Sequence, residues 1–92
     1  MERLDEKKVK KYLADTPGWI LKEATIRREL NFTDFKQALE FVNKVGKLAE
    51  NDNHHPDVYI LYNKVILQLS THSVDGLSEK DFMLARKINK LV

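Results

Sequence analysis

Several features on which enzymes are often built are missing from this sequence. It contains no cysteine, which excludes a disulfide framework and thiolate chemistry. With only three glycines, it has no glycine-rich phosphate-binding loop, and no Ser-His-Asp spacing is present. No apolar run is long enough to span a membrane, and residues 1–5 do not resemble a signal peptide. We therefore expect a cytoplasmic protein.

Charge and size narrow the possible partners. The formal net charge of +2 is too small to indicate nucleic-acid binding, and the lysines between residues 7 and 11 fit the solvated face of a short helix. The 92 residues, 42% hydrophobic and 33% charged, predict one domain over residues 1–92. So small a domain has little surface for a substrate pocket. This favours a homo-oligomer, with a site at a subunit interface.

Hydrophobic periodicity predicts three helices and two strand pairs. The expected helices span residues 5–14, 33–50 and 78–91, and the expected strands span 19–24, 26–32, 58–62 and 64–71. The links within each strand pair are very short, which favours antiparallel pairing. The order is helix, strand pair, helix, strand pair, helix. The sequence therefore predicts an α+β fold, a four-stranded antiparallel sheet with three helices packed on one face.

The central helix has the clearest pattern. Thr33 is expected to cap it, and Asp34 suits the positive end of its dipole. Residues 51–53 end the helix, and Pro56 prevents it from resuming and restricts His55 before it. The apolar residues that recur every three or four positions, and are expected to face inward, are Phe35, Ala38, Leu39, Val42, Val45, Leu48 and Ala49.

All three histidines lie between residues 54 and 72, and two of them are adjacent: His54, His55 and His72. Histidine is the side chain whose ordinary pKa lies nearest neutrality, so such a cluster can move protons at neutral pH. A simpler interpretation is that His54 and His55 are exposed, idle loop residues and that His72 is a surface or capping residue at a strand end. Loops are also where functional residues concentrate, and local sequence leaves both interpretations open.

A metal site is one alternative. The three histidines with Glu50, Asp57 or Asp81 could supply zinc ligands. Adjacent histidines on extended backbone point to opposite faces, however, so His54 and His55 are poorly placed to hold one ion. We therefore expect no metal. Asp81 also has a purely structural interpretation, because Ser78 and Asp81 fit a capping box. Glu50 can likewise be read as a solvated helix residue without a role in the site. Tyr62 and Phe82 are expected to be core or semi-core aromatics.

The spacing of these residues resembles a known signature. The chain resembles the pterin-4a-carbinolamine dehydratases, whose pattern it matches at every fixed position. In chain order, with the gaps between them, the matching residues are Glu50, three residues, His54-His55-Pro56, five residues, Tyr62, nine residues, His72, eight residues and Asp81. The resemblance runs from about residue 16 to the end. Its flanking segments are Gly18-Trp19, Phe32-Thr33-Asp34-Phe35, Tyr62-Asn63-Lys64-Val65, Ser70-Thr71-His72 and Gly76-Leu77-Ser78.

The resemblance implies a fold, a reaction and partners. It implies the same α+β architecture, in dimers that extend the sheet across subunits or in tetramers paired through helices. The implied enzyme is a dehydratase that removes water from 4a-hydroxytetrahydrobiopterin to give quinonoid dihydropterin, in tetrahydrobiopterin recycling, without a bound cofactor. Animal members also act as dimerisation cofactors of a homeodomain transcription factor. The alternatives are a non-catalytic dimerisation or coactivator module of the same fold, and a dehydratase that acts on a related pterin, for example in molybdenum-cofactor metabolism.

The chemistry of such a dehydration assigns expected roles. A hydroxyl on a carbon next to nitrogen leaves once it is protonated, and an N–H must then lose its proton, so one general acid and one general base suffice. His54 and His72 are expected to act as acid and base, and His55 to orient the pterin. Asp81 is expected to hold a histidine in the useful tautomer, and Glu50 to do the same from the helix end.

Overall fold

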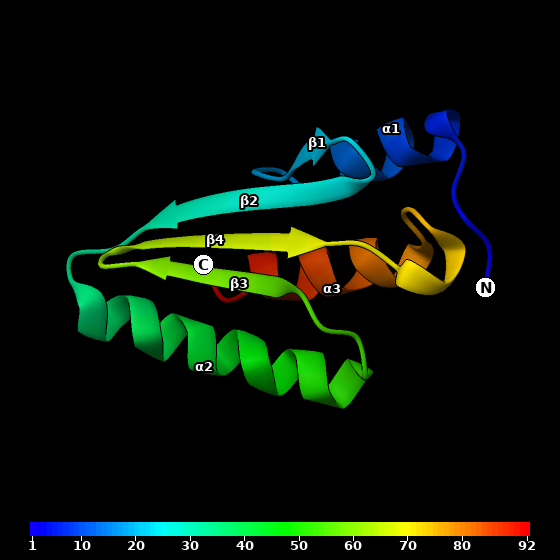
Figure 1. Cartoon of the computed structure of the whole chain (residues 1–92). Helices are drawn as coiled ribbons and strands as arrows, with labels where there is room; N and C mark the ends of the chain where they lie inside the picture. The colour runs from blue at the N-terminus through cyan, green and yellow to red at the C-terminus, as the bar shows by residue number, and fades with distance from the viewer.

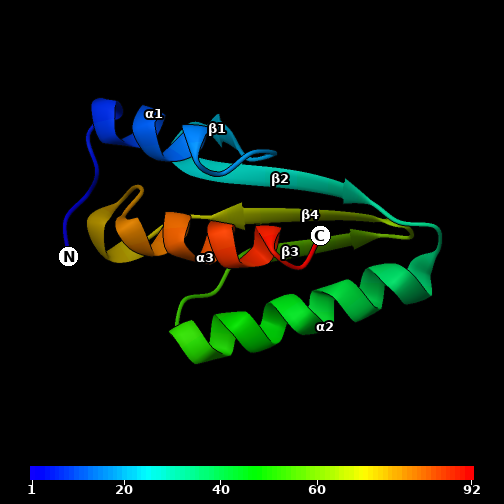
Figure 2. The same cartoon turned by 180° about the vertical axis from the view of Figure 1, so that it is seen from behind.

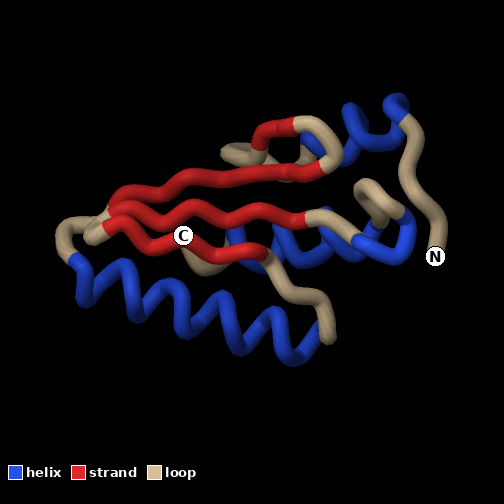
Figure 3. Tube along the Cα trace, in the orientation of Figure 1, coloured by secondary structure: helices blue, strands red, loops and turns tan.

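The computed structural model describes all 92 residues and has the predicted α+β architecture. Four antiparallel strands form one sheet in the order β1-β2-β4-β3 (Figure 1; Figure 3). Between β4 and α3 the chain makes one short 3₁₀ turn, η1. The elements are α1 (Glu6–Ala14), β1 (Ile20–Lys22), β2 (Thr25–Asn31), α2 (Phe35–Asp52), β3 (Asp57–Leu61), β4 (Lys64–Leu69), η1 (His72–Val74) and α3 (Glu79–Asn89).

One face of the sheet carries the core. Val65, Leu67 and Leu69 of β4 are fully buried, and they share this face with Ile26 and Leu30 of β2, as the register requires. Buried residues of all three helices join the same cluster, which confirms helix packing on one face (Figure 2). None of the three helices combines the length and apolar character that crossing a bilayer would require.

Helix α2 differs from the sequence-based expectation in its start and in its buried face. Thr33 is not the cap: the helix begins at Phe35, and the Asp34 carboxylate accepts a hydrogen bond from the Gln37 backbone N–H at 2.9 Å. Phe35 and Leu39, predicted to face inward, are exposed. The residues that contact the sheet are Ala38, Phe41, Val45 and Ala49. The apolar stripe of α2 is thus wider than the part of the helix surface that packs against the sheet.

The first strand pair is shorter than predicted because Trp19 leaves the sheet. Its indole N–H donates to the Asn89 side-chain oxygen at 2.8 Å, at the end of α3. The same oxygen accepts from Arg28, which lies on the core face of β2 and also donates to the Pro17 carbonyl at 3.3 Å. Arg28 packs over Gly18 at φ +89, where a Cβ would lie 2.8 Å from the guanidinium carbon. One amide thereby joins α3, β2 and the loop before β1.

Replacing Asn89 by alanine is expected to destabilise the fold without affecting chemistry elsewhere. The change leaves the Trp19 and Arg28 donors without their shared acceptor, so we expect the free energy of unfolding to fall by about 2 kcal/mol. Urea denaturation measures it. Lys90→Ala, at the exposed neighbouring position, is the matched control and should change stability by less than about 0.5 kcal/mol. Equal stability of the two variants would contradict the joining role of Asn89.

The expectation for the two aromatics is half right. Phe82 is fully buried in the core, as predicted, but Tyr62 is 67% exposed. Tyr62 lies in the two-residue turn between β3 and β4 with a φ of +56, so the turn directs its side chain away from the core. This turn is at one end of the sheet, and the segment between α2 and β3 is at the other (Figure 1). Tyr62 therefore lies far from the histidines.

Candidate active site

The sheet register brings the two histidine-bearing segments together. β3 begins just after His54-His55-Pro56, β4 ends at Leu69, three residues before His72, and Asp57 pairs with Gln68 in the antiparallel ladder. The start of β3 and the end of β4 therefore lie side by side. All three histidines line one cavity of about 380 Å³, within the usual range for small-molecule sites. Its other lining residues are Met1, Asn53, Ser70, Thr71, Ser73 and Lys80.

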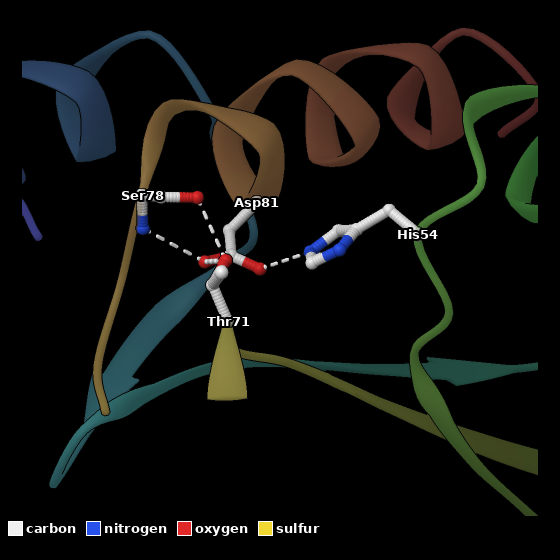
Figure 4. A network of polar contacts seen from close by, with 4 residues as sticks. All are labelled: His54, Thr71, Ser78 and Asp81. Carbon is white, nitrogen blue, oxygen red and sulfur yellow. Dashed lines mark hydrogen bonds and ion pairs between the residues drawn. The ribbon is translucent and has the colours of Figure 1, made fainter. Parts of the chain in front are cut away.

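His54 is held by a buried carboxylate. Its Nε2 lies 2.5 Å from Oδ1 of Asp81 on α3, and the two side chains are 11% and 0% exposed (Figure 4). Asn53, in the left-handed conformation with φ +50, ends α2. The His54 backbone N–H then donates a hydrogen bond to the Ala49 carbonyl at 3.1 Å. An ionised carboxylate only accepts hydrogen bonds, so Nε2 is the protonated nitrogen. Nδ1 has no hydrogen-bond partner in the chain.

His55 turns the opposite way. Its Nε2 contacts Oε2 of Glu50 in the last turn of α2, and both side chains are exposed. Pro56 follows directly, and its ring restricts the backbone of both residues. The two adjacent histidines thus have different carboxylate partners on different helices. Nowhere in the chain are three or more histidine, aspartate and glutamate side chains grouped so that they could hold a metal ion.

His72 was predicted to lie at the end of a strand, and it does not. β4 stops at Leu69, two residues earlier than expected, because Thr71 pairs with Gly76 of the following loop and not with a neighbouring strand. His72 therefore begins the η1 turn, where the Asp75 backbone N–H donates to its carbonyl at 3.0 Å. The imidazole is exposed to the cavity and makes no hydrogen bond within the chain. It is the one histidine without a carboxylate partner.

Asp81 serves two structural purposes at once. The predicted capping box is present: the Asp81 Oδ2 accepts the Ser78 backbone N–H at 2.9 Å. The same oxygen accepts the Thr71 hydroxyl at 2.8 Å, while Oδ1 faces His54. A capping pattern in the sequence therefore also marks a residue that contacts the histidine cluster.

The structure brings together most of the predicted site residues and adds others. Tyr62 is the signature residue that lies elsewhere, at the far end of the sheet. Residues that sequence reasoning did not single out for the site include Thr71, Ser78 and Lys80. Thr71 directly precedes His72, Lys80 directly precedes Asp81, and Ser78 forms the capping box with Asp81. Closeness to His72 and Asp81 along the chain was therefore the available signal. Lys80 makes no ion pair.

A second depression, of about 250 Å³, lies between the N-terminal segment, α1 and the β1–β2 turn. Its lining combines apolar residues, Leu4, Val9 and Leu21, with charged ones such as Glu6 and Lys10, and it contains no histidine. The cavity at the histidines is larger and contains all three of them, so it is the candidate active site.

Comparison with known proteins identifies the family of the chain. The family model described as pterin 4 alpha carbinolamine dehydratase matches residues 2–91. A protein of Sulfurisphaera tokodaii, named "Putative pterin-4-alpha-carbinolamine dehydratase", is 47% identical over 92 residues, which cover 100% of this chain and 99% of the relative.

Two solved structures extend the comparison. A "transcriptional coactivator/pterin dehydratase" from Brucella melitensis superposes with a TM-score of 0.92 at 35% identity, and the match covers 97% of each chain. A pterin dehydratase-like protein described as a RuBisCO assembly factor of the alpha-carboxysome shares the fold, with a TM-score of 0.66 at 19% identity over 79% of this chain and 84% of its own. The chain belongs to the pterin-4-alpha-carbinolamine dehydratase family.

Proposed function

We propose that this protein removes water from 4a-hydroxytetrahydrobiopterin to give quinonoid dihydropterin, in tetrahydrobiopterin recycling. The observation that carries the proposal is the arrangement of the three histidines around one cavity. His54 and His55 have carboxylate partners, and His72 has none. Family membership supports the pterin as the substrate class. The cavity volume of about 380 Å³ is on the scale that small-molecule sites require.

The reaction needs two proton transfers. A protonated histidine donates to the 4a-hydroxyl, the C4a–O bond breaks as the neighbouring ring nitrogen supplies its lone pair, and water leaves. A neutral histidine accepts the N–H proton that the product must lose. We assign these two transfers to His54, which a buried carboxylate holds in place, and to His72, whose ring has no partner in the chain. The carboxylate beside His55 is exposed, so His55 is given the orienting role.

The remaining residues position these groups and the substrate. Asp81 fixes the His54 ring through Nε2, which leaves Nδ1 for the pterin. Glu50 does the same for His55, whose role is to orient the pterin by hydrogen bonding. Pro56 stiffens the segment that carries both residues. The roles of Asp81 and Glu50 are argued from their contacts with a ring nitrogen, as in other sites where a carboxylate sets the histidine tautomer.

A nuclear magnetic resonance titration tests where the substrate binds. A tetrahydropterin without the 4a-hydroxyl cannot react and is the probe. We expect the ring signals of His54, His55 and His72 to shift with one dissociation constant. The ring signals of Tyr62, at the far end of the sheet, should stay in place. Shifts confined to Leu4 and Leu21, or no shift at millimolar pterin, would contradict the proposed site.

A non-catalytic coactivator or dimerisation module is the second candidate. The related protein of Brucella melitensis is described as a transcriptional coactivator as well as a pterin dehydratase, which favours this candidate. The exposed apolar surface of the edge strand β3 favours it too. A related pterin as substrate is a further variant of the first proposal. The two classes differ in one measurable property: only the dehydratase accelerates water loss from a pterin carbinolamine.

We also propose that the protein is a homo-oligomer joined through the free edge of β3. This edge strand exposes Val58, Tyr59 and Leu61, and an unpaired apolar edge is commonly covered by a second chain. Leu61→Lys is expected to shift the molar mass measured by light scattering toward the monomer. Ile20→Lys on the opposite edge strand, β1, is the matched control, because Ile20 and Leu61 are 60% and 57% exposed. A monomeric wild type, or equal masses for both variants, would contradict this interface.

A further inference from the structure

Two buried hydroxyl groups adjoin the proposed active site and have no assigned role in its chemistry, although Ser78 also caps α3. Thr71 and Ser78 are both buried, and their oxygens lie 2.7 Å apart. The Thr71 hydroxyl also lies 2.8 Å from Oδ2 of Asp81, the carboxylate that holds His54 (Figure 4). Burying two hydroxyls is costly unless each is satisfied, and here every buried polar side-chain atom has a partner.

The direction of each hydrogen bond follows from counting protons. A carboxylate only accepts, so the single Thr71 hydroxyl proton is donated to Asp81. Thr71 can then only accept from Ser78, which donates its own hydroxyl proton. The chain of donation therefore runs from Ser78 through Thr71 to one oxygen of Asp81, while His54 donates to the other oxygen. Each bond has only one possible direction.

This network fixes the orientation of the Asp81 carboxylate. Oδ2 accepts from the Thr71 hydroxyl at 2.8 Å and from the Ser78 backbone N–H at 2.9 Å. With Oδ2 held by two donors, Oδ1 has a single direction, which is toward Nε2 of His54. Without the Thr71 hydroxyl, the carboxylate keeps one donor on Oδ2 and can rotate.

Thr71 also places the other histidine. Its backbone N–H donates to the Gly76 carbonyl at 2.7 Å, and its carbonyl accepts from the Val74 N–H at 3.1 Å. These bonds close the η1 turn, which begins at His72. The side chain of one residue thus acts on His54 through Asp81, while its backbone sets the position of His72.

We propose that Thr71 and Ser78 are positioning residues, which hold Asp81 so that His54 keeps its proton on Nε2 and presents Nδ1 to the substrate. The kinetic part of this proposal rests on the proposed dehydratase function. The tautomer part rests on the hydrogen bonds alone. Both residues act through Asp81, and neither donates a proton to the substrate or accepts one from it.

Two substitutions of Thr71 separate the hydroxyl from the shape of the side chain. Thr71→Val keeps the shape and removes the donor, so we expect kcat for pterin dehydration to fall about 10- to 100-fold, the scale of one hydrogen bond to a charged group. KM should change by less than about threefold. Thr71→Ser keeps the hydroxyl and should stay within about threefold of wild type. Thr16→Val removes another buried hydroxyl, bonded to the Tyr12 carbonyl at 3.1 Å, and should leave kcat unchanged.

Nitrogen-15 chemical shifts of the His54 ring provide the readout that does not depend on activity. We expect the Nε2–H form in wild type and Thr71→Ser, and a mixture of the two tautomers in Thr71→Val. Ser78→Ala, which removes the first donor of the network, should move the His54 signals in the same direction. It replaces Thr71→Val as the test variant if Thr71→Val does not fold.

The outcomes are distinguishable. A wild-type protein without dehydratase activity would contradict the proposed function, while the His54 spectra would still test the positioning role. Unchanged His54 signals in Thr71→Val, or in Ser78→Ala if the first variant is unfolded, would overturn the role of the two hydroxyls. A loss of kcat in Thr71→Ser as large as in Thr71→Val would overturn it as well, because the hydroxyl would then not be the group that matters.

Discussion

Replacing His54 or His72 by alanine is expected to lower kcat for pterin dehydration by about 10²–10⁴-fold in each case, the usual contribution of a positioned acid or base. His54→Ala removes the nitrogen that Asp81 orients, and His72→Ala removes the histidine without a carboxylate partner. The hydroxyl must be protonated for water to leave, and the N–H proton must then be lost to give the product, so a turnover needs both the acid and the base. Stopped-flow absorbance with a synthetic 4a-hydroxytetrahydropterin measures the loss.

His55→Ala is the comparison for these two variants. Its partner Glu50 is exposed, and the proposed role of His55 is to orient the pterin. We therefore expect the main effect of His55→Ala on KM, with a smaller loss of kcat than in the other two variants. Circular dichroism must show that all three remain folded. Full activity of both His54→Ala and His72→Ala would refute the assignment of acid and base.

Asp81→Ala is expected to damage stability and activity together. The substitution removes the acceptor of two buried donors, the Thr71 hydroxyl and the Ser78 backbone N–H, and of the partly buried His54 ring. Leaving buried donors without a partner is costly, and the capping box is lost as well. We expect the free energy of unfolding to fall by about 3 kcal/mol. Because His54 loses its orienting partner, kcat should also fall by at least about tenfold.

Asp57→Ala is the matched control for this variant. Asp57 is an exposed carboxylate at the start of β3, close to the same segment, and forms no ion pair. Its removal should change the free energy of unfolding in urea by less than about 0.5 kcal/mol. If Asp81→Ala were as stable and as active as Asp57→Ala, Asp81 would be neither the support of His54 nor a significant cap of α3.

The sequence predicts the architecture well because hydrophobic periodicity reflects which side of each element is covered. Alternation in β2 places Ile26 and Leu30 on one face, and both are buried there. Periodicity cannot tell how wide the covering surface is. Phe35 and Leu39 have the correct helical spacing but lie beside the stripe of α2 that contacts the sheet, whereas Phe41, outside the predicted set, is buried.

The candidate site is predictable in its residues but not in its pairings. The spacing of the signature identifies His54, His72 and Asp81 as a set. The contact between His54 and Asp81 joins residues 27 positions apart and depends on how α3 packs beside the end of α2. Thr71 stands next to His72 in a flanking segment of the signature, but only the folded chain places its hydroxyl against the Asp81 carboxylate.

Tyr62 shows the opposite limit. It stands at a signature position, yet it lies in the β3–β4 turn, at the end of the sheet away from the cavity. Presence in a signature therefore does not place a residue in the site. For Tyr62 the physical reason is local: a two-residue turn needs a residue that accepts positive φ, and its side chain then projects into solvent.

The proposed dehydratase function is tested by the rate at which the wild-type protein dehydrates synthetic 4a-hydroxytetrahydropterin. We expect a rate above the buffer reaction that increases in proportion to protein concentration, reaches saturation with substrate and forms quinonoid dihydropterin. No acceleration over buffer, from protein shown to be folded, would refute the dehydratase function and favour the non-catalytic module.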